Sequence, residues 1–157
     1  MVRKRILGVD FGHARIGLAL SDESQIIASP LENLVVRNQN PADVFAAFLA
    51  KLIKEKGYSI EVIVVGLPLL MSGKDSQTTA DARKFVDELR AKISTPIELF
   101  DERLTSVQAD RLLIEADFTR KKRASFVDRV SATLLLQGFL DKRRAADFGG
   151  SGTPDVF

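Results

Sequence analysis

Four carboxylates occupy places where an acidic side chain needs a chemical reason. Asp10 ends the short apolar run 6–9, and Asp101 and Glu102 follow another predicted strand at 97–100. Asp128 lies in a segment that is apolar almost all round at helical spacing. Burying a carboxylate is costly unless a cation or hydrogen-bond donors meet it. Together these oxygens could hold Mg²⁺ or Mn²⁺ and support metal-assisted displacement at phosphorus.

Each acid also has a purely structural interpretation. Asp10 could be a turn residue, because Asp is common shortly before a glycine. The charged segment 101–103 could be a solvated turn with its own ion pair. Asp128 could be a buried acid paired with Arg103, with Arg129 or with a helix end. The residue pattern by itself leaves these alternatives open.

Composition narrows the chemistry of any site. The 157 residues contain no cysteine and one histidine, so disulfides, thiol catalysis and a multi-histidine zinc site within one chain are excluded. Any metal would therefore be held mainly by carboxylates, which suits hard divalent ions. The 23 Lys and Arg against 21 Asp and Glu give a net charge of +2, which does not by itself indicate nucleic acid.

Basic residues are instead concentrated locally. A contiguous run precedes the segment of Asp128 and could neutralise phosphates of a nucleic acid, although a solvated loop is the alternative; its members are Arg120, Lys121, Lys122 and Arg123. Lys74 lies in a polar loop that could contact phosphate but lacks the pattern of a nucleotide-binding P-loop. His13 could carry a proton or contact phosphate, and a plain turn residue is the simpler interpretation.

The predicted elements alternate in a way that indicates an α/β protein. Five strands are expected, at 6–10, 16–20, 26–36, 60–65 and 97–100, the third interrupted by Pro30. Helices are expected from Pro41 to Gly57, around 85–93, after 105 and over 124–142. The result is a mixed sheet, with opening antiparallel hairpins followed by parallel strands and with helices on both faces. Sites in such sheets form at the carboxyl ends of the parallel strands.

The chain is long enough for one domain, predicted over residues 1–144. Residues 145–157 are rich in Gly, Ser and Pro near the end and are predicted to be a disordered tail. The basic start and the short apolar run after it fit neither a signal peptide nor a membrane span. We therefore expect a cytoplasmic protein without a membrane partner.

Three segments carry a family resemblance: VDFGHARIGLALSD, then VVGLPLLMSG with LFDERLTS, and RKKRASFVDRVSATLLLQGFL. Together they resemble the YqgF/RuvX family of pre-16S rRNA nucleases, which are related to Holliday-junction resolvases of RNase H-like fold. The resemblance covers nearly the whole chain except the tail. It implies a cytoplasmic, divalent-metal-dependent nuclease that matures the 5′ end of ribosomal RNA.

The resemblance also implies roles for single residues. Asp10 matches the family's first-strand acid, Asp101 and Glu102 fall in its DER segment, and Asp128 matches its final-helix acid; these four form the expected catalytic set. Related resolvases place an acid after the fourth strand, where residues 66–70 here have none. We therefore expect Asp10, Glu102 and Asp128 to bind Mg²⁺ or Mn²⁺, with Asp101 pairing with Arg103 or a backbone group. The expected nucleic-acid contacts are Arg15, Lys74, Arg103, Arg120, Lys121, Lys122 and Arg123.

The expected partner is therefore RNA, the pre-16S ribosomal precursor, and branched DNA is the alternative substrate. A Holliday-junction resolvase and a non-catalytic RNA-binding factor of ribosome biogenesis are the competing functions. An ATP-binding domain of the actin-like group also begins with an Asp-x-Gly turn, but one domain lacks the second lobe needed to close over a nucleotide. The sequence leaves the oligomeric state open, as monomer or homodimer.

Overall fold

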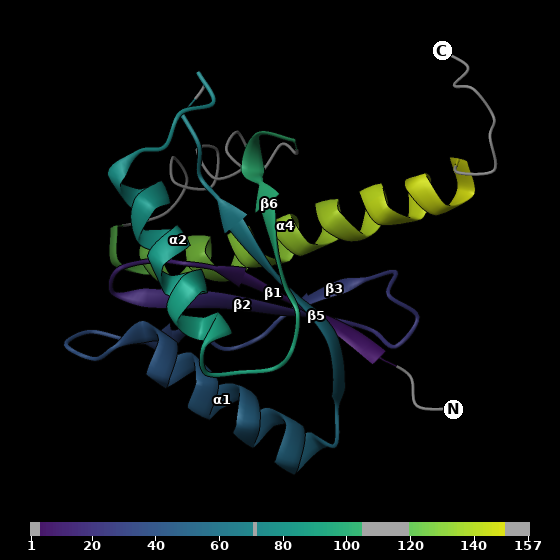
Figure 1. Cartoon of the computed structure of the whole chain (residues 1–157), viewed down its shortest axis with the longest axis horizontal. Coiled ribbons are helices and arrows are strands. Elements are labelled where there is room, and N and C mark those ends of the chain that lie inside the picture. The colour runs from purple at the N-terminus through teal and green to yellow at the C-terminus, as the bar shows by residue number, and fades with distance from the viewer. Residues whose placement is uncertain (1–3, 71, 105–119, 150–157) are drawn as a thin grey trace.

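A mixed β-sheet forms the centre of the molecule in the computed structural model, which describes residues 4–70, 72–104 and 120–149 (Figure 1). Its strands are β1 (Lys4–Asp10), β2 (Arg15–Ser21), β3 (Ala28–Pro30), β4 (Leu34–Val35), β5 (Ser59–Leu67) and β6 (Ile97–Asp101). The order is β3-β2-β1-β5-β6, and β4 also pairs with β2. β1 runs antiparallel to β2 and parallel to β5, which is itself parallel to β6. The predicted mixed sheet is confirmed.

The sheet has six strands rather than the predicted five, because the segment 26–36 forms two short strands. Pro30 has no N–H to donate, so it suits the end of a strand at the sheet edge. Beyond it the chain stays close to β2 through two backbone hydrogen bonds, from the amide of Leu31 to the carbonyl of Leu18 (2.9 Å) and from that of Val36 to that of Ala14 (2.9 Å).

Helix α1 (Pro41–Lys56) begins and ends where its sequence predicts. The Asn40 side chain accepts a hydrogen bond from the amide of Asp43 (3.0 Å), and proline occupies the first turn, where no amide donor is needed. Gly57 ends the helix at a φ of 68°, a left-handed conformation that glycine adopts without strain.

Helix α2 (Gln77–Arg90) begins at a capping box made by Ser76 and Thr79. The Thr79 hydroxyl also donates to the carbonyl of Pro68 (2.8 Å), which ties the start of the helix to the loop after β5. The helix ends before Ile93, a residue predicted to lie on its apolar face, which instead packs against the core from the following turn.

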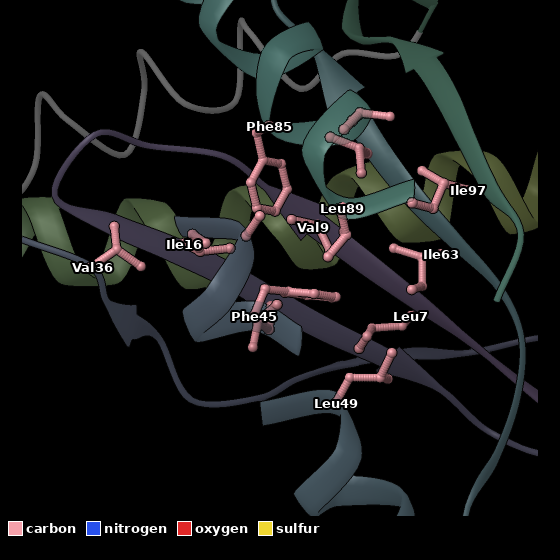
Figure 2. Close-up of a cluster of buried hydrophobic side chains, with 14 of the residues drawn as sticks. Leu7, Val9, Ile16, Val36, Phe45, Leu49, Ile63, Phe85, Leu89 and Ile97 are labelled. Carbon is pink, nitrogen blue, oxygen red and sulfur yellow. The ribbon is translucent and has the colours of Figure 1, made fainter. Parts of the chain in front are cut away.

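Two separate cores cover the two faces of the sheet. On one face, α1 and α2 pack over Leu7, Val9, Ile16 and Ile63 through side chains that include Phe45, Leu49, Phe85 and Leu89 (Figure 2). On the other face, the last helix α4 (Arg120–Gly149) packs over Ile6, Ala19, Val62, Val64 and Phe100 through Ala132, Leu135, Leu136, Phe139 and Leu140. Figure 1 shows α1 and α2 in front of the sheet and α4 behind it. The prediction of helices on both faces is confirmed.

Helix α4 is longer at both ends than the predicted 124–142. The basic run 120–123, predicted to lie just before this helix, forms its first turn, and residues 145–149, expected in a disordered tail, continue it. Arginine and alanine favour helix in this extension, and the Arg143 guanidinium pairs with the Glu61 carboxylate (2.5 Å), holding that end against β5. The predicted helix after 105 and residues 150–157 lie outside the described residues. No helix of the described part is long and apolar enough to cross a membrane.

Two glycines in the sheet determine how closely α4 approaches. A Cβ added at Gly8 of β1 would lie 2.8 Å from Cβ of Leu136, and one added at Gly66 of β5 would lie 2.9 Å from Cδ2 of Leu135. Both distances are shorter than van der Waals contact, so a side chain at either place would push the helix or its leucines away.

Candidate active site

The carboxyl ends of β1, β5 and β6 meet at one edge of the sheet. Val9 is in register with Val65, and Gly66 with Phe100, so Asp10, Gly66 and Phe100 form a row across three neighbouring strands. Strands lie about 4.8 Å apart, so the two outer positions of this row are separated by roughly 10 Å. Carboxylate side chains that extend from those two strands can therefore converge over the middle one.

Asp10 and Glu102 belong to the same face of the sheet. Successive strand residues point to opposite faces, and Gly8, two residues before Asp10, faces α4. The Glu102 carboxylate is on this face too, because its Oε1 would lie 2.7 Å from a Cβ added at Gly66. Because Gly66 has no side chain, the Glu102 carboxylate can lie over β5, the strand between β1 and β6.

Glu102 is buried, with 1% of its surface exposed, directly after β6. The chain turns there into a short 3₁₀ helix, Glu102–Leu104, and the Asp101 carboxylate stabilises this turn. Asp101 Oδ1 accepts a hydrogen bond from the amide of Arg103 (2.9 Å), and Oδ2 pairs with the Arg103 guanidinium (2.7 Å). The hydrogen bonds from Arg103 hold the pKa of Asp101 below its usual value, and Asp101 raises that of Arg103. The expected pairing of Asp101 with Arg103 is confirmed.

The structure describes the backbone of α4 at Asp128 and leaves its side chain outside the described residues. Position 128 lies one helical turn before Ala132, whose carbonyl oxygen would be 3.4 Å from a Cβ added at Gly8. It also lies two turns before Leu135, the residue beside Gly66, on the same stripe of the helix. Among the described side chains no group of three acids or histidines could hold a metal. The metal site with Asp128 therefore stays a prediction.

The expected nucleic-acid contacts lie in several places near this edge. Arg103 contacts the loop after β5, since its guanidinium is 3.5 Å from a Cβ placed at Gly73. That loop also contains Lys74, whose carbonyl accepts a hydrogen bond from the amide of Leu70 (3.0 Å). Arg103 therefore lies against the loop that carries Lys74. Arg15 begins β2, beside the end of β1. For the run 120–123 the structure describes the helical backbone only.

One contact near the site was not predicted. The exposed imidazole of His13 lies 2.6 Å from the Asp81 carboxylate of α2, measured from Nε2 to Oδ2. This hydrogen bond is the main cause that lowers the pKa of Asp81. The two residues are 68 positions apart, so no local pattern in the sequence could have indicated the pair.

Comparison with known proteins adds a family and a fold. A family model described as "RuvX: Holliday junction resolvase" matches residues 4–142. A relative from Protochlamydia amoebophila is 45% identical, over 88% of this chain and 94% of its own, and one from Koribacter versatilis is 46% identical, over 90% of each. Both are named "Putative pre-16S rRNA nuclease".

Among solved structures, the chain is similar to that described as T. thermophilus RuvC in complex with Holliday junction substrate, with a TM-score of 0.54. The similarity covers 90% of this chain and 96% of that chain at 11% identity, and a second structure of Thermus thermophilus RuvC gives a TM-score of 0.51 at 12% identity. At such identities the likeness shows a shared fold.

Proposed function

Because the chain belongs to the RuvX family and has its RNase H-like fold, we propose that it is a metal-dependent nuclease that matures the 5′ end of pre-16S ribosomal RNA in the cytoplasm. The names of its relatives support the substrate. The observation that carries the proposal is the placement of Asp10 and the buried Glu102 on one face of the sheet, on either side of Gly66.

The residues at this edge suit a hard divalent ion. Glu102 is enclosed, and the absence of a side chain at Gly66 makes room for its Oε1. A carboxylate in such surroundings favours a cation with oxygen ligands, and the chain has no cysteine and only one histidine to offer a softer one. Asp10, Glu102 and Asp128 would hold Mg²⁺ or Mn²⁺. Bound there, such an ion would lower the pKa of a water molecule and neutralise charge on the phosphate.

The other residues at this edge orient those ligands and the substrate. Asp101 stabilises the short 3₁₀ helix that begins with the buried Glu102. Arg103, the partner of Asp101, lies beside the loop that contains Lys74. The proposed phosphate contacts are Arg15, Lys74, Arg103, Arg120, Lys121, Lys122 and Arg123. A basic run in the first turn of α4 would deliver RNA to the edge where position 128 lies.

The family model's own description favours a second candidate, cleavage of Holliday junctions. One assay separates the candidates: labelled pre-16S RNA and a four-way DNA junction are incubated in Mg²⁺ or Mn²⁺ with the full chain and with Asp10→Asn. We expect the chain to cleave the RNA, and the variant to bind it without cleaving. Cleavage of the junction alone would assign the second candidate. Undiminished cleavage by Asp10→Asn would refute the active site, and binding without cleavage by both would indicate a non-catalytic RNA-binding factor.

A further inference from the structure

A cavity of about 250 Å³ lies on the opposite face of the sheet from α4, beside the end of β1. Its walls come from the β1–β2 connection, from α2 and from the start of α1. We call it the His13 cavity, and the residues that matter here are Phe11, His13, Asn40, Asp81, Lys84 and Glu88.

The His13 imidazole is exposed yet held in place. Its side chain is 63% exposed, but Nε2 bonds to Asp81, and the ring stands edge-on to Phe11 with centroids 5.8 Å apart. Phe11 is itself packed on Phe85 at 4.9 Å. The loop that carries His13 is tight, because a Cβ added at Gly12 would lie 2.5 Å from the carbonyl oxygen of Arg15. An exposed ring that is fixed in advance can stack on a ligand with little loss of side-chain entropy.

The polar groups of the cavity favour a ligand whose edge donates hydrogen bonds. The Glu88 carboxylate receives a hydrogen bond at Oε2 from the Asn40 side chain (2.9 Å), and its Oε1 can still accept one. Asp81 receives hydrogen bonds from His13 and from Gln77 (3.0 Å). Two carboxylates repel a free anion, whereas the exposed Lys84 at the same cavity can neutralise a phosphate at its margin. An aromatic surface, hydrogen-bond acceptors and one cation together match a nucleotide with its base turned inward.

We infer that the His13 cavity binds an unpaired nucleobase of the RNA strand, close to the scissile phosphate. This inference rests on the proposed nuclease function. His13 follows Asp10 by three residues, so their Cα atoms are at most about 11 Å apart. The base stacks on the imidazole, its N–H groups face Glu88, and Lys84 lies beside the neighbouring phosphate. Proteins read RNA mostly through unpaired bases stacked on aromatic side chains, so the cavity would select where the strand is cut.

The test uses the full-length Asp10→Asn variant, which would hold RNA without cleaving it. Pre-16S RNA fragments carry 2-aminopurine at one position at a time around the mature 5′ end, where cleavage is proposed, and fluorescence is followed in Mg²⁺. Stacking on a ring quenches this base, so we expect strong quenching at one position next to the cleavage point. Adding His13→Ala should abolish that quenching and weaken binding about tenfold, the effect typical of losing one stacked base.

Further variants separate stacking from charge. His13→Phe keeps a ring without its bond to Asp81 and should restore most of the quenching. His13→Ala should leave the salt dependence of binding unchanged, whereas Lys84→Ala should reduce its slope by about one, as expected for one phosphate contact. Lys51→Ala, on the exposed side of α1, is the matched control and should change neither. Thermal unfolding of each variant checks that it is folded.

The outcomes separate this inference from the proposed function. If the chain cleaves RNA but quenching survives in His13→Ala, or if that variant lowers the salt slope, the base site is refuted and the nuclease stands. If RNA binds with His13-dependent quenching but the chain does not cleave it, the base site stands and catalysis is refuted. If no RNA binds, both are refuted.

Discussion

Gly66→Ala is the substitution that most directly tests the geometry of the proposed site. The new Cβ would lie 2.7 Å from Oε1 of Glu102 and 2.9 Å from Cδ2 of Leu135, both too close for contact. These two atoms are the ends of flexible side chains, so they can rotate away while the backbone stays in place. We therefore expect the Glu102 carboxylate to leave its position at little cost to folding.

Gly8→Ala is the matched control, one strand away on the same face. There the new Cβ would meet Cβ of Leu136 at 2.8 Å, an atom that cannot move without the helix. Overpacking of this kind costs about 1–3 kcal/mol; we expect the upper part of this range for Gly8→Ala and about 1 kcal/mol for Gly66→Ala. At roughly 2–4 °C per kcal/mol, Tm falls by ~4–12 °C and by ~2–4 °C, respectively.

Cleavage activity should fall more in Gly66→Ala than in Gly8→Ala, although Gly66→Ala is the more stable of the two variants. Gly66→Ala should cleave pre-16S RNA at least about tenfold more slowly, and should need more Mg²⁺ for half-maximal rate, because a ligand is displaced. The assay measures single-turnover cleavage at a temperature well below both transitions, over a range of Mg²⁺ concentrations, alongside thermal unfolding. A folded Gly66→Ala variant with an unchanged rate and Mg²⁺ requirement would refute the placement of Glu102 in the metal site.

The remaining predictions concern charge and capping. Glu102→Gln should slow cleavage at least about a hundredfold, because it removes a proposed metal ligand. Asp101→Asn should slow it only about tenfold, because Asp101 positions Glu102 without binding the metal. Equal losses in single-turnover assays would contradict this difference. The lowered pKa of Asp101 means that its stabilisation is complete above about pH 4 and is lost as the pH falls through its folded pKa, so acid unfolding of Asp101→Asn should be less steep there. Neutralising residues 120–123 should reduce the salt slope of RNA binding by up to about four, and an unchanged slope would mean that the run touches no phosphate. Asn40→Ala should lower the free energy of unfolding by about 1 kcal/mol, seen as a lower Tm, because α1 loses its N-terminal cap.

Much of the fold was predictable because local rules and tertiary packing agree in it. The segment 62–65 of the fourth predicted strand is a continuous apolar run because both faces of that strand are covered, and α1 carries its proline and its terminal glycine at the expected places. The segment 26–36 was predicted as a single strand interrupted at Pro30, because its apolar content does not show that the chain beyond the proline pairs with β2 as a separate short strand. Helix α4 continues beyond its predicted end at 142 because Arg143 pairs with Glu61, a residue far away in the sequence.

For the candidate site, the sequence could indicate which acids to consider but not how the strands around them are arranged. Strand ends and a buried helix indicated Asp10, Glu102 and Asp128, and the DER spacing indicated that Asp101 would pair with Arg103. The proximity of Gly66 to Glu102 could not be predicted, because it depends on the register between β5 and β6. No single segment of the sequence determines that register. The pair of His13 and Asp81 likewise depends on where α2 is placed.

The position of α4 in the chain has a consequence for how the protein is made. During synthesis β1, β2 and β5 are complete long before residues 120–149 appear, and until then Ile6, Ala19 and Val64 have no helix to cover them. Position 128 arrives with the same helix. A nascent chain therefore lacks its second core, and under the proposed function it also lacks Asp128, so we expect a truncated product to be unstable and unable to cleave RNA.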